Sequence, residues 1–405
     1  MSKHLETGTS ETATLTALAE HFVSKGKVTS VAPLGNGNIN STYLVTVAAP
    51  TGTKAEQTAN FAKRFVLQRI NSQVFRQPEL VIQNMAVLTE HLQGHLQDSA
   101  VNETYRWETP RILPTNTAQN FWRDDAGEYW RAISFIENSQ VCETVKSVAH
   151  AKEVGYGLAM FHRLISTIAV DRLADTLEGF HITPSYLAQY EQVLQTWKAR
   201  NNDNENHTDT PTTNKEANPK EVDLVQYCLD FVEQRKDWAH VLEQAKDSGK
   251  LHLRPIHGDP KVNNILLDAQ GRAISLIDLD TLKPGLVHYD IGDCLRSGCN
   301  PLGEETEDWQ RVEFDTNLAK AMLEGYLSLA KDFLIEQDYH YLYDAIRLIA
   351  FELGLRFFTD YLAGNVYFKV NHPTHNLSRA LVQFKLTESI EAQAETLKDI
   401  ILALQ

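Results

Sequence analysis

Two kinds of hydrophobic periodicity divide the chain at about residue 137. Before that point, short apolar stretches between turn residues predict strands at 28–34, 43–47, 61–70, 111–113, 120–123 and 128–136. Helical spacing of apolar residues appears at 14–25 and 77–92, while residues 1–10 are polar and are expected to be mobile. The first lobe, 1–137, is therefore predicted to be a small, mainly antiparallel sheet with the helix at 77–92 inserted between its strands.

After residue 145 the period is that of helices. Val154, Leu158, Phe161 and Leu164 share one face, and further helices are predicted at 222–234, 238–247, 309–329, 339–361 and 384–404. The second lobe, 138–405, is thus expected to be larger and mainly helical. Ala217 is the one apolar residue of 200–221, so this stretch is predicted to be a disordered insertion.

One hairpin interrupts the helical pattern. Strands are predicted at 265–267 and 273–277, joined by the turn residues Asp268 to Gly271. Asn264 directly precedes the first strand and Asp278 directly follows the second, so the hairpin is expected to bring them to one edge. An amide oxygen and a carboxylate are suitable ligands for one hard cation.

The residues around this hairpin follow the spacing of a kinase catalytic loop. His257, Asp259 and Asn264 match H-R-D-x-x-x-x-N with Gly258 in place of the Arg, and Asp278-Leu-Asp280 stands where D-F-G is expected. Phosphoryl transfer needs a group that accepts the substrate's proton, here Asp259, and metal ligands, here Asn264, Asp278 and Asp280. Lys261 either stabilises the transferred phosphoryl group or pairs with a neighbouring carboxylate.

The first lobe offers candidates for contacting a nucleotide. Gly35-Asn36-Gly37-Asn38 lies between two predicted strands, as a loop over phosphates would. Gln68 or Arg69 occupies the position of the usual phosphate-binding cation. Arg69 is favoured because a guanidinium binds two phosphate oxygens at once. Glu79 and Glu90 are alternative partners for that cation on the following helix.

These motifs resemble a known superfamily. His257-Gly-Asp259, Asn264 and Ile277-Asp278 are similar to the aminoglycoside phosphotransferase and choline kinase superfamily of small-molecule kinases. Leu279-Asp280-Thr281, Pro284-Gly285 and Asp290-Ile-Gly-Asp293, with the segments 35–43 and 67–71, resemble the N-acetylhexosamine 1-kinases within it. The resemblance extends from about residue 28 to about residue 385.

The resemblance implies an α+β, bilobal protein-kinase-like fold that uses ATP and Mg²⁺. It implies transfer to the anomeric hydroxyl of an N-acetylhexosamine (GlcNAc or GalNAc), an amino sugar of carbohydrate metabolism. Backbone groups of Phe135 to Glu137 would meet the adenine. The acceptor would contact Asn38, Asp259, Asp293, Arg296 and Arg356.

Several alternatives remain open at this point. Arg356 could instead pair with Glu352, four residues earlier on a predicted helix. The acceptor could be choline, homoserine, an aminoglycoside or methylthioribose, and Trp309, Tyr361 and Tyr367 could form an aromatic cage for a choline. Ser297 stands where the sugar kinases would have an aromatic wall. The remaining alternative is a catalytically dead kinase fold.

Composition narrows the partners and the compartment. A net charge of −15 disfavours nucleic acid. The four cysteines form no metal-binding or C-x-x-C spacing, so reduced thiols in a cytoplasmic protein are expected. The sequence has neither a signal peptide pattern nor an apolar run of about 18 residues, so we expect no membrane association. Oligomeric state is not indicated.

Overall fold

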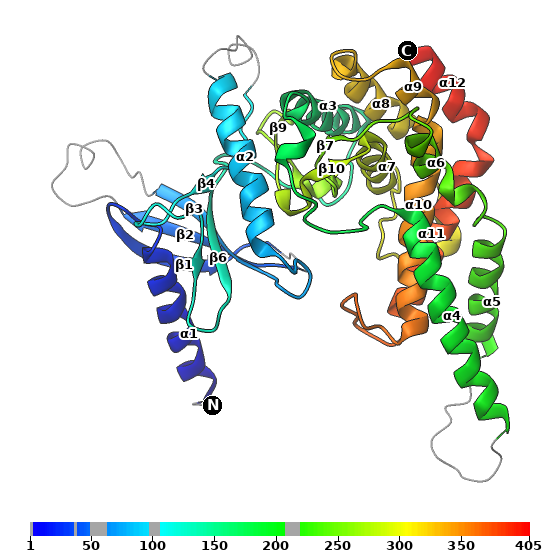
Figure 1. Cartoon of the computed structure of the whole chain (residues 1–405), viewed down its shortest axis with the longest axis horizontal. Coiled ribbons are helices and arrows are strands. Elements are labelled where there is room, and N and C mark those ends of the chain that lie inside the picture. Colours follow the sequence, from blue (N-terminus) through cyan, green and yellow to red (C-terminus); the bar gives the residue numbers. More distant parts are fainter. Residues whose placement is uncertain (1–2, 36–38, 49–62, 97–105, 207–218) are drawn as a thin grey trace. The chain divides into compact units, whose positions relative to one another are not determined.

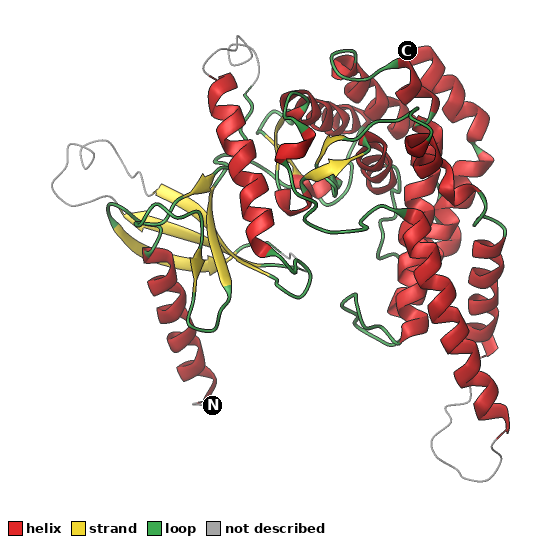
Figure 2. Cartoon of the chain, viewed as in Figure 1, coloured by secondary structure: helices red, strands yellow, loops and turns green. Residues whose placement is uncertain are grey.

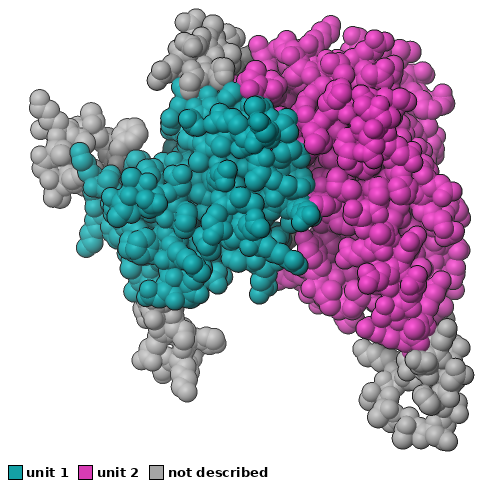
Figure 3. Space-filling view, in the orientation of Figure 1, with its two compact units in different colours: residues 1–139, 168–178, 277–284 teal, residues 140–167, 179–276, 285–405 magenta. Residues whose placement is uncertain are grey.

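The computed structural model describes residues 3–35, 39–48, 63–96, 106–206 and 219–405 of the chain (Figure 1). The chain forms two compact units. Unit 1 comprises 1–139, 168–178 and 277–284, and unit 2 comprises 140–167, 179–276 and 285–405 (Figure 3). The chain first passes from one unit to the other between Ser139 and Gln140, two residues after the boundary expected from the sequence.

Unit 1 is built on an antiparallel sheet in the order β1-β2-β3-β6-β4, with β5 also paired to β6 (Figure 2). The strands are β1 (Lys27–Pro33), β2 (Ser41–Ala48), β3 (Lys63–Ile70), β4 (Ile112–Leu113), β5 (Trp122–Arg123) and β6 (Tyr129–Ser134). The predicted strands are confirmed to within a few residues. In the register, Gln68 of β3 lies opposite Arg131 of β6, and Arg69 lies opposite Trp130.

Two helices accompany this sheet. α1 (Lys3–Glu20) contributes Leu18 and Ala19 to a buried cluster with Val45, Leu67 and Trp130. α2 (Pro78–Leu96) buries Met85, whose sulfur contacts Arg131. Because neighbouring residues of a strand face opposite sides, β6 directs Trp130 toward α1 and Arg131 toward α2.

The N-terminal helix differs from its prediction at both ends. It begins at Lys3, within the segment expected to be mobile, and it ends at Glu20 instead of residue 25. The backbone amides of His21 and Phe22 then close tight turns, and Gly26 adopts a φ of +101° that an L side chain rarely adopts.

Two segments that the sequence assigned to the second lobe belong to unit 1. The Asn84 side chain of α2 donates to the carbonyl oxygen of Ala174, at 2.8 Å, and to that of Leu282, at 2.7 Å. These bonds attach both 168–178 and 277–284 to the same helix. Such long-range hydrogen bonds from a side chain to backbone carbonyl oxygens leave no periodic signal in the sequence.

Unit 2 is mainly helical, as predicted. Its helices are α3 (Val148–Ile165), α4 (Thr183–Asn206), α5 (Pro219–Glu233), α6 (Val241–Asp247), α7 (Val287–Gly298), α8 (Thr316–Ala330), α9 (Glu336–His340), α10 (Leu342–Ala363), α11 (His375–Ala392) and α12 (Ala394–Leu404). The short strands are β7 (Arg254–Ile256), the hairpin β8 (Ile265–Leu267) and β9 (Ala273–Leu276), and β10 (Lys283–Gly285) at the border with unit 1.

Some helix boundaries in unit 2 correct the prediction. The helix expected at 309–329 begins only at Thr316, where the Asp315 side chain caps it by accepting from the amides of Asn317 and Leu318. The helix expected at 384–404 is two helices, which meet at Gln393. α4 extends to Asn206 and α5 starts at Pro219, so both ends of the predicted disordered insertion are helical, and 207–218 lies outside the described residues.

α3 and α8 approach each other closely through glycines. A Cβ added to Gly155 would lie 1.9 Å from the Met322 carbonyl oxygen, and one added to Gly325 would lie 2.0 Å from that of Lys152. The two helix backbones therefore touch, which fixes α3 in the helical core of unit 2.

The four cysteines are free thiols.

Candidate active site

The β8–β9 hairpin forms as predicted. Ile265 lies opposite Leu276 in its register. Asn264 therefore stands immediately before the start of β8, and Asp278 is the second residue after the end of β9. Asp278 is exposed and adopts a left-handed backbone conformation, with φ 67° and ψ 58°. That conformation is uncommon for a residue other than glycine, and Asp tolerates it better than most.

The turn that carries Asp259 is fixed through its backbone by a buried carboxylate. Gly258 has a φ of +90°. The Asp290 carboxylate accepts from the amide of His257 at 2.7 Å and from the amide of Gly258 at 2.8 Å. His162 lies 2.8 Å from the same carboxylate. Asp290 thus braces this turn.

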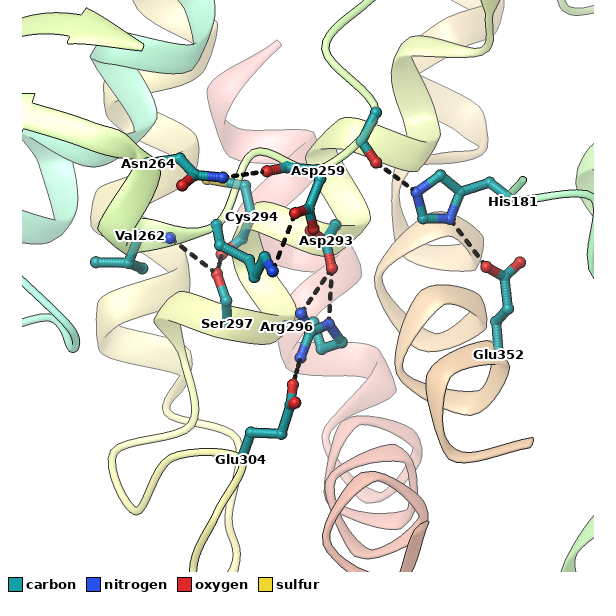
Figure 4. A network of polar contacts seen from close by, with 12 residues as sticks. His181, Asp259, Val262, Asn264, Asp293, Cys294, Arg296, Ser297, Glu304 and Glu352 are labelled. Atoms are coloured by element: carbon teal, nitrogen blue, oxygen red, sulfur yellow. Dashed lines mark hydrogen bonds and ion pairs between the residues drawn. The ribbon is translucent and has the colours of Figure 1, made fainter. Parts of the chain in front are cut away.

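On its carbonyl side the same turn is held by His181, which sequence reasoning missed. Its Nε2 lies 2.7 Å from the Gly258 carbonyl oxygen, and its Nδ1 lies 2.9 Å from Glu352 of α10 (Figure 4). The Thr183 hydroxyl donates to the other Glu352 oxygen at 2.6 Å. Both partners of the imidazole are oxygens that accept, so both ring nitrogens carry protons.

The charge on this buried pair follows from its contacts. Although burial alone would lower the pKa of His181, the charge of Glu352 and the hydrogen bond to it raise that pKa. Glu352 is therefore the partner of His181 and Thr183, and not of Arg356, with which an ion pair was considered as an alternative.

Asp259 is in contact with two other predicted site residues. Lys261 Nζ lies 2.9 Å from its Oδ2, and the Asn264 side chain donates to its carbonyl oxygen at 2.8 Å. Burial and the neighbouring Asp293 carboxylate raise the pKa of Asp259, while the Lys261 ammonium opposes this. In turn the Asp259 carboxylate raises the pKa of Lys261. Lys261 thus takes the second of its two predicted roles, that of a partner to a carboxylate.

Asp293 has the opposite electrostatic setting. Burial would raise its pKa, but the Arg296 guanidinium, 2.8 Å away, holds that pKa below its usual range. Arg296 also donates to Glu304 at 3.0 Å (Figure 4). Two neighbouring carboxylates whose pKa values are pushed apart are typical of one proton acceptor and one permanent anion.

One oxygen of this cluster is left without a partner. Among the described residues, Asp293 Oδ2 is buried and has no hydrogen-bond partner. A buried carboxylate oxygen in that state costs free energy until a donor reaches it.

Ser297, where an aromatic wall was expected, accepts from the Val262 amide at 3.3 Å and donates to the Cys294 carbonyl oxygen at 3.1 Å.

Arg356 of α10 lies among aromatic rings. Its guanidinium carbon is 4.9 Å from the ring centre of Tyr186, 5.1 Å from that of Phe180 and 5.5 Å from that of Phe368. These distances are those of cation–π contacts. The chain's own cation therefore occupies this aromatic box.

The predicted nucleotide residues of unit 1 are separated by the sheet. Gly35 has a φ of +72°, and Asn36, Gly37 and Asn38 lie outside the described residues. Arg69 is exposed on the side of Trp130 and donates to Ser41 at 3.2 Å. Gln68 faces the opposite side, toward α2, and its oxygen accepts from Arg131 at 2.7 Å.

The acidic residues of α2 do not supply the expected partner of a phosphate-binding cation. Glu79 accepts from the Tyr129 hydroxyl, and Glu90 pairs with Arg172 at 2.9 Å. The residues predicted to meet the adenine, at the end of the first lobe, are in contact with Arg64 of β3. Its guanidinium stacks on Phe135 at 4.6 Å and pairs with Glu137.

Asp280, the third candidate metal ligand, has both oxygens engaged. Oδ1 pairs with the buried Arg131, and Oδ2 accepts from the Asn40 side chain. Sequence reasoning missed Arg131, although a charged residue inside the apolar run of β6 was a signal for it. Of the other two predicted metal ligands, Asn264 belongs to unit 2 and Asp278 to unit 1, and each carries an oxygen of the kind that Mg²⁺ prefers.

The chain has a bilobal, kinase-like α+β fold. One unit contains the antiparallel sheet, and the other contains most of the helices, the braced Asp259 turn and the hairpin that follows it. The model of the phosphotransferase enzyme family matches residues 30–330, and the chain belongs to this family. The predicted fold and superfamily are thus confirmed, whereas the specificity for N-acetylhexosamine is left to proposal.

Solved structures support the same fold. An aminoglycoside phosphotransferase from Alicyclobacillus acidocaldarius subsp. acidocaldarius DSM 446 has a TM-score of 0.60 at 15% identity, with 96% of each chain covered. A microcompartment-associated aminopropanol kinase has a TM-score of 0.56 at 16% identity, covering 95% of this chain and 98% of its own. Within the described residues, no helix is both long and apolar enough to cross a membrane.

Proposed function

We propose that this protein is an ATP- and Mg²⁺-dependent kinase that transfers the γ-phosphoryl group to a hydroxyl of a small molecule. The observation that carries the proposal is the braced Asp259 turn. Its backbone is held by Asp290 on the amide side and by His181 on the carbonyl side, and its carboxyl has a raised pKa. A fixed carboxylate with a raised pKa is suited to accept the proton of a hydroxyl.

In this proposal each residue of the turn has a defined task. Asp259 orients the acceptor hydroxyl and takes its proton, and Lys261 pairs with the Asp259 carboxylate and holds it in place. Asn264 and Asp278 would hold Mg²⁺, which neutralises charge on the phosphates. Gly35 to Asn38, Gln68 or Arg69, and the backbone from Phe135 to Glu137 would contact ATP.

For the acceptor we propose the anomeric hydroxyl of an N-acetylhexosamine. A sugar has hydroxyls that can donate to the unpartnered Asp293 Oδ2, and oxygens that can accept from Arg296 and Arg356. These side chains would thus offer an anion and cations to a neutral and oxygen-rich acceptor.

A quaternary ammonium acceptor such as choline fits these contacts poorly. The aromatic box of Phe180, Tyr186 and Phe368 already surrounds Arg356. Of the three rings considered for a cage, Trp309 packs on Tyr227 and Tyr361 donates to Glu221, while Tyr367 packs on Phe368 of the box around Arg356. A second cation placed against Arg356 would be repelled, which favours the sugar over choline.

A panel of acceptors tests the proposal. ATP consumption is measured with GlcNAc, GalNAc, choline, ethanolamine, homoserine, methylthioribose and an aminoglycoside, and the product is identified by phosphorus NMR. We expect turnover with an N-acetylhexosamine and a 1-phosphate product. Turnover confined to another acceptor contradicts the sugar assignment, and no turnover with bound nucleotide would favour the dead kinase fold.

A further inference from the structure

Arg131 is a buried charged residue in the sheet of unit 1. It is 1% exposed and lies in β6, the strand that pairs with β3. Its Nη2 donates to Gln68 at 2.7 Å, and Nη1 contacts the Met85 sulfur at 3.1 Å. The amide is neutral and the thioether is a weak acceptor, so neither compensates a buried positive charge.

The compensating charge comes from Asp280. Arg131 Nη2 pairs with its Oδ1, and the Asp280 side chain is 4% exposed. Among the described residues this is the ion pair that Arg131 forms. The partner of the sheet's buried cation is therefore not an acidic residue of α2, since Glu79 and Glu90 bond to Tyr129 and Arg172.

Asp280 is one of several points that fix the segment 277–284. Its carbonyl oxygen accepts from the Thr176 hydroxyl at 2.9 Å, and the carbonyl oxygen of Leu282 accepts from Asn84 at 2.7 Å. Its second carboxylate oxygen accepts from Asn40, whose own oxygen accepts from the Asn71 amide at 2.9 Å. The segment is thus anchored to α2, to 168–178 and, through Asn40, to the end of the β2–β3 pair where β2 begins and β3 ends.

The anchored segment carries Asp278 in its left-handed conformation, two residues before Asp280. A side chain held in a sparsely populated backbone conformation persists only where its surroundings enforce it. Asp280 lies within the 3-10 turn Leu279–Thr281, and Asp278 is the residue directly before that turn, so one short backbone segment carries both aspartates.

We propose that Arg131 is a positioning residue of the phosphoryl-transfer site: its ion pair with Asp280 fixes the direction of the Asp278 carboxylate toward the metal. The inference rests on the proposed metal role of Asp278. A buried ion pair is poor evidence for stability, because apolar residues of similar volume often replace one at no cost. What apolar residues cannot replace is the fixed direction that paired hydrogen bonds impose.

This difference supplies the test. The double variant Arg131→Met/Asp280→Met exchanges the pair for apolar side chains, so no unpaired charge is buried. Its melting temperature, its affinity for ADP in EDTA and the Mg²⁺ concentration that half-maximally strengthens ADP binding are measured by calorimetry on the full chain. The matched control, Arg235→Met/Glu391→Met, removes an ion pair of 2.7 Å in unit 2.

We expect the double variant to fold and to bind ADP in EDTA within about twofold of wild type, with apparent Mg²⁺ affinity lower by about 10-fold or more, the usual effect of losing a group that orients a metal ligand. The control should keep wild-type Mg²⁺ affinity. Wild-type Mg²⁺ affinity in the double variant overturns the inference. An equal loss of ADP affinity in EDTA also overturns it, because Arg131 would then bind phosphate itself.

Two single variants cover the remaining outcomes. If the double variant does not fold, Arg131→Lys decides, because it keeps the charge but not the paired donors; unchanged Mg²⁺ affinity there refutes the positioning role. Asp278→Asn should abolish the strengthening of ADP binding by Mg²⁺. If it does not, the metal role of Asp278 fails and this inference fails with it. If Asp278→Asn abolishes the Mg²⁺ effect but the Arg131 and Asp280 variants keep wild-type Mg²⁺ affinity, the positioning role is refuted and the proposed function is unaffected.

Discussion

Asp259 and Asp293 are carboxylates of one site whose surroundings move their pKa values in opposite directions. Burial and the Asp293 charge raise the pKa of Asp259, whereas Arg296 keeps that of Asp293 low. The difference arises from cations: Asp259 has one ammonium at 2.9 Å, while Asp293 accepts two guanidinium contacts on a single oxygen at 2.8 Å. The roles of proton acceptor and permanent anion are therefore set by neighbours.

Asp259→Asn should lower kcat by at least about 100-fold, because it removes a general base that typically contributes 10²–10⁴-fold. The amide is nearly isosteric, so the affinity for ADP should stay within about twofold. Steady-state kinetics and calorimetry measure the two quantities. An active variant would exclude Asp259 as the base.

Asp293→Asn should raise the KM for the acceptor by about 10-fold while changing kcat less, because a charge-assisted hydrogen bond worth roughly 1.5–3 kcal/mol is weakened. Kinetics at varied acceptor concentration give this split. Asp308→Asn, at an exposed ion pair in the same unit, is the control and should change neither constant. A loss confined to kcat would assign Asp293 to the chemical step.

At the scale of elements, α10 supports the Asp259 turn from a distance. Glu352 of this helix holds His181, and His181 holds the Gly258 carbonyl oxygen. His181 itself has a φ of +66°, uncommon for a residue other than glycine. A helix with no residue in the catalytic loop thus contributes to the geometry of that loop.

The His181–Glu352 pair should make stability depend on pH in a defined direction. The folded-state pKa of His181 is raised, so the folded protein retains a proton that the unfolded chain loses at about pH 6.5. The stabilisation is complete below about pH 6.5 and disappears as pH rises through the folded pKa. We therefore expect Glu352→Gln to melt at a lower temperature than wild type. This difference in melting temperature should be largest at pH 6 and should shrink as the pH rises to 9. A constant difference would contradict a charged pair.

The contact between α3 and α8 predicts an unusual sign for a glycine substitution. Replacing a helical glycine by alanine usually stabilises by up to about 1 kcal/mol. In Gly325→Ala the new Cβ would lie 2.0 Å from the Lys152 carbonyl oxygen, so we expect a loss of about 1–3 kcal/mol or more from overpacking. Urea unfolding measures it, with the exposed Lys320→Ala on the same helix as a control that should stay within about 0.5 kcal/mol.

At the scale of the whole molecule, the segment 277–284 belongs to unit 1, although the residues directly before and after it belong to unit 2. It follows the β8–β9 hairpin of unit 2, yet it is bonded to Asn40, Asn84 and Arg131 of unit 1. A ligand held by this segment should therefore stabilise the fold of unit 1.

Removing the metal should show how much it contributes to stability when it is bound with the nucleotide. Saturating ADP with Mg²⁺ should raise the melting temperature more than ADP with EDTA, because a ligand at 100 times its Kd adds about 2.7 kcal/mol. Asp278→Asn should bring the two conditions together. Equal melting temperatures in wild type, with and without Mg²⁺, would show that the chain does not bind the metal with the nucleotide.

The sequence was most informative where chemistry depends on local spacing. The period of apolar residues distinguished the sheet from the helical unit, and the turn residues from Asp268 to Gly271 predicted the β8–β9 hairpin. Helix ends were less predictable: the sequence predicts the first helix at 14–25, but α1 ends at Glu20. Such ends depend on which backbone groups find partners.

Local spacing also located Asp259, Asn264 and Asp278, because the residues of a catalytic loop and hairpin are held together by short covalent paths. The tertiary structure alone decided which charges meet. Arg131 and Asp280 are 149 positions apart and His181 and Glu352 are 171 apart, and no periodicity connects them. Pairing of buried charges is selected by the packing of distant elements, and its free energy exists only after water has been excluded.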